Sequence, residues 1–243
     1  MILISAVCAC GDYFTVSRDG ELCLIPGMQG LRATLHYKTP GNHQFRPGDY
    51  PWLARVRVRV QAGGGGSAGA DADASQTIAR PGGAGGGYSE ALIALADLGT
   101  TESVVVGAGG TAGGANAAGG PGGTSSFGGF VVANGGDGGT ANMDSGVAIT
   151  TSSGVAGPLA GTGEVNMGGG ASGTALRLSG TNGYAGFGGD SFMGTGGLGR
   201  STAGPGTSTR GYGAGAGGAL SLNGSAEAGG TGGNGIVIVE LYG

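Results

Sequence analysis

The chain has 243 residues, of which 64 are glycine and only 11% are charged, with a formal net charge of −4. Charge-driven disorder requires low hydrophobicity together with high net charge, so this composition excludes that class of disordered protein. Residues 63–235 carry ten acidic residues and four arginines. This part of the chain therefore lacks the basic surface that nucleic-acid binding needs.

The N-terminal residues 1–10 are apolar, without a positively charged start, and Gly11-Asp12 ends the run early. The run is too short for a signal peptide or a membrane span, so we expect a first strand and synthesis in a cytoplasm without an export signal. The three cysteines, Cys8, Cys10 and Cys23, form neither an even disulfide set nor a good zinc site. We expect them to be small buried side chains in a reducing compartment.

Short strands are expected first at residues 2–7, 13–17, 21–25 and 31–37. Asp19-Gly20 separates the second and third of these, and Asp-Gly is a strong hairpin signal. Residues 39–42, Thr-Pro-Gly-Asn, have the chemistry of a turn. The N-terminal part therefore predicts a small β unit.

The clearest strand covers residues 52–62, where small or branched apolar residues alternate with arginines. Ala54, Val56, Val58 and Val60 face one side, and Arg55, Arg57 and Arg59 face the other. The period of two predicts a strand with one core face and one face that is wet or paired with acids. A nucleic-acid ladder is disfavoured because no aromatic residue is interleaved with the arginines.

A glycine-rich tract follows, interrupted by apolar runs at residues 88–98, 102–106, 127–133, 147–149 and 175–178. Glycines bracket residues 88–98, so a strand is favoured there over a short helix. Residues 236–239 are four consecutive β-branched residues, which is typical of a strand buried on both faces. We expect this last strand to lie beside residues 53–62 in the middle of a sheet.

The glycines lack the strict Gly-x-y period of collagen, and Gly-Gly-x and Gly-x-Gly-Gly units are commoner. Two structures fit this pattern. One is a bundle of polyglycine-II-like helices, with three residues per turn and bare faces in close backbone contact. The other is a set of loops with positive φ, which glycine adopts readily. The sequence leaves both open.

Motifs that suggest chemistry are weak here. Gly65-Gly66-Ser67-Ala68-Gly69 matches the Gly-x-Ser-x-Gly nucleophile elbow, but the only histidines, His36 and His43, precede it, whereas the elbow needs a later base. Asp71, Asp73 and Asp137 lack the spacing of a calcium-binding glycine repeat, and we expect them to be turn-forming. We therefore predict no catalytic, cofactor-binding or metal-binding residues and no enzyme activity.

One aromatic cluster, Tyr184, Phe187 and Phe192, lies among glycines, and Tyr212 follows. Rings on polar, glycine-rich loops supply contact area at low entropy cost, so all four residues are candidates for receptor binding. The alternative is that the rings fill a thin core, which is favoured more for Phe187 and Phe192 than for the tyrosines.

Five short segments of the chain carry a resemblance. Two of them come before the alternating strand: Thr39-Pro40-Gly41-Asn42-His43-Gln44-Phe45 and Asp49-Tyr50-Pro51-Trp52-Leu53. Two come after it: Val104-Val105-Val106-Gly107-Ala108-Gly109-Gly110 and Gly122-Gly123-Thr124-Ser125-Ser126-Phe127-Gly128. The last lies near the C-terminus: Gly233-Asn234-Gly235-Ile236-Val237-Ile238-Val239-Glu240. Together they resemble the glycine-rich domain of bacteriophage tail fibre and minor tail proteins, in a variant similar to those of actinobacteriophages.

The resemblance implies a place at the distal tail of a virion, a homotrimer, and recognition of a host-surface glycan or protein by binding. We expect an all-β chain with a small N-terminal unit (residues 1–38) for attachment to other tail proteins or trimerisation. A glycine-rich, sandwich-like tip module (residues 39–243) follows. No nucleic acid, cofactor or membrane insertion is expected. The alternatives are a bacterial glycine-rich cell-surface protein and a tail-associated polysaccharide-degrading enzyme.

Overall fold

The computed structural model describes residues 14–25 and 28–243. The predicted strand at residues 2–7 and two cysteines, Cys8 and Cys10, lie outside these ranges. Within them the regular elements are strands, apart from two single-turn 3-10 helices, η1 (Pro47–Asp49) and η2 (Leu95–Asp97). The predicted all-β class is confirmed.

The first two described strands form a hairpin. β1 (Phe14–Val16) pairs antiparallel with β2 (Leu22–Leu24), so that Phe14 faces Leu24 and Val16 faces Leu22. Gly20 has a φ of 84°, the left-handed conformation that a tight hairpin turn requires and that glycine adopts without strain. The Asp-Gly signal therefore predicted this turn correctly.

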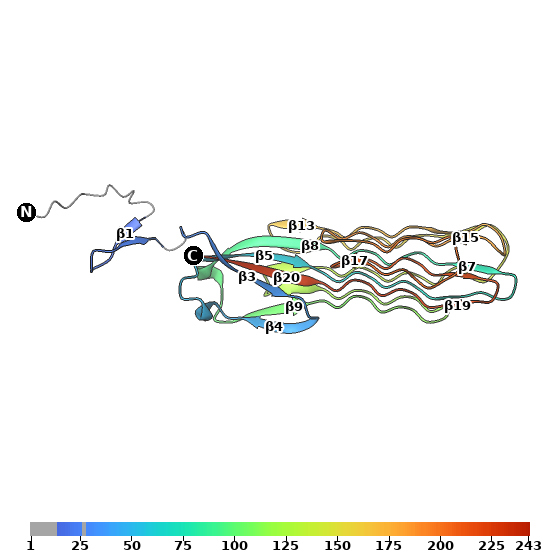
Figure 1. The fold of residues 1–243 in the computed structure, drawn as a ribbon, viewed down its shortest axis with the longest axis horizontal. Coiled ribbons are helices and arrows are strands. Elements are labelled where there is room, and N and C mark those ends of the chain that lie inside the picture. The colour runs from blue at the N-terminus through green and yellow to red at the C-terminus, as the bar shows by residue number, and fades with distance from the viewer. Residues whose placement is uncertain (1–13, 26–27) are drawn as a thin grey trace, which may run out of the picture.

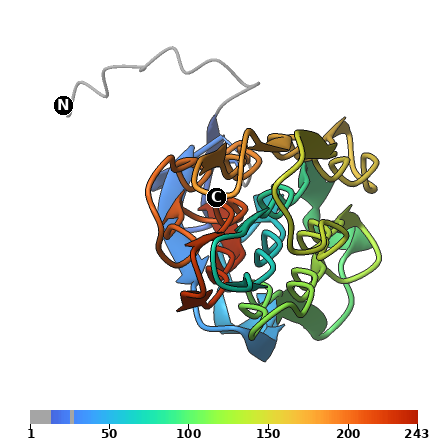
Figure 2. The same ribbon diagram turned by 90° about the vertical axis from the view of Figure 1, so that its right-hand side faces the viewer.

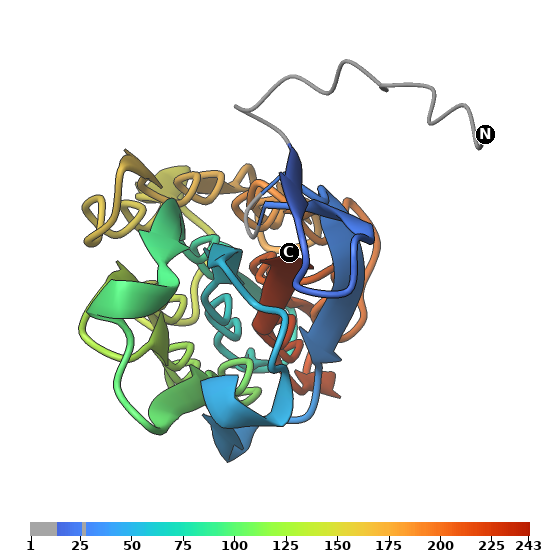
Figure 3. The same ribbon diagram turned by 90° about the vertical axis from the view of Figure 1, so that its left-hand side faces the viewer.

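Two antiparallel sheets pack face to face in a sandwich at one end of the long molecule (Figures 1 and 3). The larger sheet has the order β13 (Val165–Met167), β8 (Tyr88–Ala94), β5 (Arg55–Gln61), β20 (Ile236–Tyr242) and β3 (Leu31–Tyr37). The smaller sheet has the order β11 (Val131–Ala133), β10 (Ser125–Phe127), β9 (Glu102–Val106) and β4 (Gly41–Phe45). Most of the strands expected from the apolar runs are present in these two sheets.

The core of the sandwich comes from alternating residues of both sheets. Val56, Val58 and Val60 of β5 are fully buried, as the alternation predicts, and Phe127 of the smaller sheet packs in the same cluster. The C-terminal strand β20 lies between β5 and β3, with Val239 opposite Val58. The predicted pairing of the last strand with residues 53–62 in the middle of a sheet is confirmed.

Strand β3 qualifies the expected division of the chain at residue 38. All of β3, from Leu31 to Tyr37, pairs with β20 and so belongs to the sheet of the second unit. The predicted boundary falls after this strand, because a turn signal at residues 39–42 marks a corner of the sandwich rather than a domain linker. The role given to residues 1–38 stays a prediction.

Three other local predictions differ from the structure. The apolar run at residues 127–133 is not one strand but the end of β10, a turn and β11, which pair antiparallel. Residues 88–98 form strand β8 followed by the 3-10 helix η2, so the strand is shorter than the apolar run. Residues 147–149 are not a strand, and β12 (Thr150–Ser152) begins directly after them. Val147 and Ile149 are exposed, so this apolar run does not report a buried element.

Beyond the sandwich the chain runs back and forth along the long axis in extended coils, which Figure 2 shows end-on. We call this part the glycine lattice. Its segments include residues 62–69, 80–87, 107–114, 117–124, 134–139, 213–219 and 228–235. Backbone hydrogen bonds between segments recur every third residue, which is the repeat of a polyglycine-II-like helix.

Segment 62–69 lies at the centre of the lattice. Its amides donate to carbonyl oxygens of three segments. Gly63, Gly66 and Gly69 donate to Gly123, Gly120 and Ala117, in that order. Gly64 and Ser67 donate to Gly233 and Gly230, and Gly65 donates to Ala84. Its carbonyls accept from three others: from Gly110 and Gly113, from Gly136 and Gly139, and from Ala216. The buried backbone of this segment is therefore satisfied by six neighbouring segments rather than by a sheet.

The close packing explains the run Gly63-Gly64-Gly65-Gly66. A Cβ on any of these four residues would overlap a backbone carbonyl of a neighbouring segment. None of the four has a φ in the left-handed region, so the interpretation of this tract as positive-φ loops is wrong. Segment 107–114 lies at the outside, and there Ala108 and Thr111, three residues apart, are exposed. The Gly-x-Gly-Gly units thus place their side chains on the surface of the lattice.

Short strands close the end of the lattice farthest from the sandwich (Figure 1). They are β6 (Ala70–Asp71) with β19 (Ala226–Glu227), β7 (Thr77–Ala79) with β18 (Leu220–Leu222), and β12 with β14 (Ala175–Arg177) and β15 (Gly183–Tyr184). A further pair, β16 (Gly194–Thr195) and β17 (Arg210–Gly211), lies along the lattice. We call the end formed by β6, β7, β12, β14, β15, β18 and β19 and the loops between them the tip.

Candidate binding surface at the tip

The sheet β12–β14–β15 has one inward and one outward face. Thr150 pairs with Arg177, and Ser152 with Ala175, and the side chains of Ser152, Ala175 and Arg177 are buried. The alternate positions point outward. Continuing the register by one pair places Ile149 opposite Leu178, and Tyr184 pairs with Leu176 on the same outward face.

The outward face is apolar and exposed. Ile149 is 73% exposed, Leu178 50% and Tyr184 43%. Val147, 62% exposed, lies in the loop just before Ile149 and would contact a Cβ on Gly180 through its Cγ1. We call Val147, Ile149, Leu178 and Tyr184 the tip patch. Exposed apolar side chains gathered in one place mark surfaces that bind a partner.

A buried arginine holds the loop that carries two residues of the tip patch. Arg177 is 8% exposed, and its Nε donates to the carbonyl oxygen of Ala148 at 2.7 Å. Its Nη1 donates to the carbonyl oxygens of Thr77 at 3.0 Å and Asp144 at 2.5 Å. The loop between Asp144 and Ala148 is therefore tied to strand β7 through one guanidinium.

A second buried arginine fixes the start of the same loop. Arg80 is 1% exposed and donates to the carbonyl oxygens of Gly69 at 2.9 Å and Met143 at 2.8 Å. It also donates to Asn116 Oδ1 at 2.7 Å. Burial lowers the pKa of Arg80 to about 10, so the side chain remains charged near neutral pH. A buried cation held by carbonyl and amide oxygens makes the tip loops rigid at the cost of its own desolvation.

The tip turns use strained but supported backbone. Among the described residues, the non-glycine residues with positive φ are Ser75, Asn116 and Asn223. Asn223 Oδ1 accepts from Ser75 N at 2.8 Å, and Asn116 exchanges hydrogen bonds with the backbone of Asp71. Left-handed residues persist where their surroundings determine them. The tip loops are therefore preorganised rather than floppy.

The four predicted receptor-binding aromatics do not gather at one place. Tyr184 lies at the tip, and Phe187 follows in the lattice, 53% exposed. The ring of Phe192 lies 4.2 Å from that of Tyr88 in β8, at the sandwich, and Tyr212 accepts a hydrogen bond from Ser191. Phe192 is 58% exposed, so the suggestion that Phe187 and Phe192 fill the core is wrong. Binding by these four residues stays a prediction.

The sequence interpretation missed Arg80, Arg177, Val147, Ile149 and Leu178. A signal for the arginines was present, because residues 63–235 hold only four, and an isolated cation in a glycine tract has to be explained. No signal distinguished the exposed apolar residues from core residues. Their exposure depends on the register between β12 and β14, which are far apart in the sequence.

The weaker sequence motifs have structural positions. Ser67 is fully buried; its hydroxyl donates to the carbonyl of Gly217 at 2.7 Å and accepts from Gly230 N at 2.8 Å. His36 is exposed on β3, and His43 Nε2 lies 2.8 Å from the Thr39 carbonyl. The described residues contain no group of three or more His, Cys, Asp or Glu side chains that could hold a metal. Cys23 is a free thiol.

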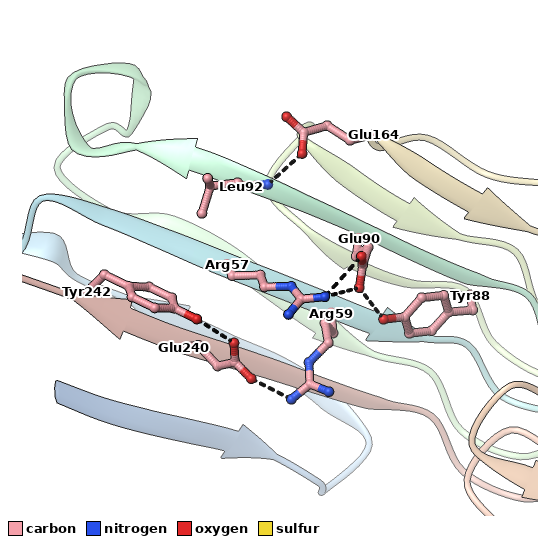
Figure 4. Close-up of polar contacts among 8 residues, drawn as sticks. All are labelled: Arg57, Arg59, Tyr88, Glu90, Leu92, Glu164, Glu240 and Tyr242. Carbon is pink, nitrogen blue, oxygen red and sulfur yellow. Dashed lines mark hydrogen bonds and ion pairs between the residues drawn. The ribbon is translucent and has the colours of Figure 1, made fainter. Parts of the chain in front are cut away.

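Two arginines of β5, Arg57 and Arg59, pair with acids on the outer face of the larger sheet (Figure 4). Arg57 lies 3.2 Å from Glu90, and Arg59 lies 2.6 Å from Glu240. Tyr88 donates to Glu90 at 2.6 Å, and Tyr242 donates to Glu240 at 3.0 Å. The prediction that this face is wet or paired with acids is confirmed. We call these six residues the charge ladder.

The charge ladder shifts the pKa values of Glu90 and Tyr88. The hydrogen bond from Tyr88, with that from Arg57, lowers the pKa of Glu90 below its ordinary value. Burial, together with the Glu90 carboxylate, raises the pKa of Tyr88. Glu90 and Tyr88 are therefore each held in the form they have at neutral pH, which is typical of a structural network rather than of a general acid or base.

The fold and the tip thus define a glycine-lattice β protein with a preorganised surface at one end. Residues 45–242 match the family model described as a glycine-rich domain, and the chain belongs to this family. No curated protein matches the chain. In the part of the chain that the structure describes, no helix is long and apolar enough to cross a membrane.

Proposed function

We propose that this protein is a binding module at the distal end of a bacteriophage tail, which attaches to the host surface through the tip patch. The observation that carries the proposal is the combination of exposed Val147, Ile149, Leu178 and Tyr184 with loops held rigid by Arg80 and Arg177. Rigid loops lower the entropy cost of binding, and exposed apolar side chains supply the contact area.

The shape of the molecule supports an adhesive role. The tip lies at the far end of the lattice from the sandwich (Figure 1). A lattice joined by backbone hydrogen bonds is a stiff spacer that presents the tip away from whatever holds the sandwich. The bacteriophage assignment rests on the resemblance of residues 39–243 to tail fibre and minor tail proteins. Attachment to other tail proteins through residues 1–38, assembly as a homotrimer and synthesis in the host cytoplasm belong to the same proposal.

The proposal is tested by adding the fluorescently labelled full chain to a panel of actinobacterial strains and measuring cell-bound fluorescence. We expect binding to a narrow set of strains without release of sugar reducing ends from their walls. The double variant Ile149→Ser/Leu178→Ser is expected to bind about tenfold more weakly or worse, since hot-spot truncations cost at least about 1–2 kcal/mol each.

The matched control is Leu92→Ser, which changes an equally exposed leucine on β8 of the sandwich. It should bind like the unchanged chain. Equal losses in both variants, or binding to every strain regardless of surface, would contradict attachment through the tip. Reproducible release of reducing ends would favour the polysaccharide-degrading enzyme instead.

A further inference from the structure

The smaller sheet of the sandwich carries a hollow of about 770 Å³ beside its strands β4 and β9. Its lining includes Asn42 and Gln44 of β4, Ser103 of β9, and Thr101 just before β9. Phe45 is buried in the core, so the alternation along β4 turns Gln44 and Asn42 to the outer face of the sheet. Gln44 pairs with Ser103, and opposite residues of an antiparallel pair share a face. We call Asn42, Gln44, Thr101 and Ser103 the polar hollow.

His43 borders the same hollow, but the alternation along β4 turns its side chain to the core side. There its Nε2 lies 2.8 Å from the carbonyl oxygen of Thr39, and its ring centroid lies 5.5 Å from that of Tyr37 in β3. These contacts tie the edge strand β4 to the corner that joins it to β3. The strand under the polar hollow is therefore held in place, and side chains on a fixed strand are positioned more precisely than side chains on a loop.

The side chains of the polar hollow are exposed, and most of their hydrogen-bonding groups are free. Asn42, Thr101 and Ser103 have no side-chain hydrogen bond to any residue that the structure describes. Gln44 Oε1 accepts from Arg46 Nη2 at 3.2 Å, which orients the carboxamide and leaves its Nε2 hydrogens available. The outer face of the larger sheet differs, because there the charge ladder satisfies its own members.

The chemistry of the polar hollow suits an uncharged ligand rich in hydroxyl groups. Carboxamides and hydroxyls both donate and accept hydrogen bonds, as the hydroxyls of a sugar do. Among the described residues that line the hollow there is no carboxylate, ammonium or guanidinium to neutralise a charged ligand. A volume of about 770 Å³ also lies within the usual range of small-ligand sites.

We propose that the polar hollow is a binding site for a neutral saccharide, the uncharged sugar residues of a cell-surface polysaccharide. The carboxamides of Asn42 and Gln44 bind sugar hydroxyls from one strand, and the hydroxyls of Thr101 and Ser103 bind them from the next. The hollow lies beside β4 and β9 in the sandwich, at the opposite end of the molecule from the tip patch (Figure 1). The site is therefore separate from the proposed attachment surface and goes beyond it.

The test measures binding of the full chain to immobilised dextran, mannan and arabinogalactan by biolayer interferometry. We expect binding to at least one of these neutral polysaccharides. The double variant Asn42→Ala/Gln44→Ala should weaken that binding about tenfold or more, because it removes two carboxamides that bind the sugar. The absence of binding to all three polysaccharides would overturn the site.

Thr34→Ala/His36→Ala is the matched control. Thr34 and His36 are likewise exposed, alternate residues of an edge strand of the sandwich, but they lie on β3 in the other sheet. This variant should change the affinity less than about twofold, because surface substitutions away from a site have small effects. Equal weakening by the two double variants would contradict binding in the polar hollow.

Nuclear magnetic resonance of the isotope-labelled full chain locates the ligand without any substitution. Oligosaccharides of the polymer that binds should shift the side-chain amide signals of Asn42 and Gln44. The signal of Asn182, an exposed asparagine at the tip, should stay unchanged. The reverse pattern, with a shift of Asn182 and none of Asn42 and Gln44, would overturn the site even if the double variant failed to fold.

Salt dependence separates a neutral ligand from charge attraction through Arg46. Raising sodium chloride from about 0.05 M to about 0.5 M should change the affinity for the polysaccharide less than about twofold, because salt screens interactions between charges. A tenfold or larger loss over this range would mean that the ligand is an anion held by arginine, and would contradict the proposal.

The two proposals can fail separately. Ile149→Ser/Leu178→Ser should bind the polysaccharide like the unchanged chain, and a loss equal to that of Asn42→Ala/Gln44→Ala would overturn the polar hollow as the site. If Ile149→Ser/Leu178→Ser keeps its full binding to cells while Asn42→Ala/Gln44→Ala loses the polysaccharide, the polar hollow stands and attachment through the tip patch fails.

Discussion

In the sandwich, side chains fill the space between two sheets, whereas in the glycine lattice the backbones themselves are in contact. Phe127 and Val58 are buried because two sheet faces meet around them. Gly64 and Gly65 are buried because carbonyl groups of neighbouring segments occupy the space where a side chain would begin. The first region is stabilised mainly by apolar burial, and the second mainly by satisfied backbone hydrogen bonds.

The difference changes which substitutions matter. A sandwich core tolerates apolar residues of similar volume, since only the total volume and pattern must be kept. An inner lattice position such as Gly64 or Gly65 tolerates no side chain, because one added carbon atom would displace a whole neighbouring segment. Glycine is conformationally costly, and the close approach of segments is what offsets that cost here. The glycines of this chain are therefore its core residues in the lattice.

The largest expected effect follows from a single added methyl group. Gly65→Ala places a Cβ on the carbonyl oxygen of Asp137, and we expect a loss of about 3 kcal/mol or more in the free energy of unfolding, or failure to fold. Gly114→Ala is the matched control, because its Cβ would meet nothing within 4 Å and its φ is not in the left-handed region. Urea denaturation followed by circular dichroism measures both.

Gly114→Ala should be neutral or more stable by up to about 1 kcal/mol, since alanine restricts the unfolded chain. Similar, small changes in both variants would mean that the segments separate easily and that the lattice does not depend on backbone contact.

The sequence predicted the sandwich better than the lattice for a physical reason. A strand with one buried face has an apolar period of two, so residues 54–60 and 236–239 revealed both the strands and their burial. A lattice segment has almost no side chains, so its three-residue period is visible only in the hydrogen bonds. The open choice between helices and loops could not be settled without knowing which segments are neighbours.

The candidate binding surface at the tip was harder to predict from the sequence than the lattice. Tyr184 was named from its sequence context, yet Ile149 and Leu178 become its neighbours only through the pairing of β12 with β14. Arg80 and Arg177 serve oxygens that lie tens of residues away in the chain. Glycine-rich segments carry little information about such pairing, because a slip of three residues preserves their pattern.

Replacing a buried arginine of the tip that has no acidic partner should lower the free energy of unfolding more than replacing an arginine of an ion pair on the sandwich. Arg80→Met leaves the carbonyls of Gly69 and Met143 without donors. We expect the free energy of unfolding to fall by about 2 kcal/mol, after subtracting what is gained by removing a buried charge. Arg57→Met breaks the ion pair with Glu90. Because the Arg57 side chain is 44% exposed, the free energy of unfolding should fall by only about 0–1 kcal/mol.

Urea denaturation again gives the free energies, and binding to a responsive strain gives a second measurement. Arg80→Met should weaken cell binding because the loop with Val147 loosens, whereas Arg57→Met should not. A larger loss of stability in Arg57→Met than in Arg80→Met would reverse the comparison and make the charge ladder the more important network.

The smallest expected effect is the pH dependence of the charge ladder. Hydrogen bonds from Tyr88 and Arg57 lower the pKa of Glu90 in the folded chain. Its contribution to stability is therefore complete above the ordinary glutamate pKa of about 4.3 and is lost as the pH falls through the lower folded-state value. Glu90→Gln cannot titrate, so it should lose less stability than the unchanged chain between pH 7 and pH 3, as measured by urea denaturation. Parallel losses in the two proteins would mean that the tyrosine and arginine bind the neutral carboxyl equally well, and that the charge of Glu90 does not contribute to the stability of the sandwich.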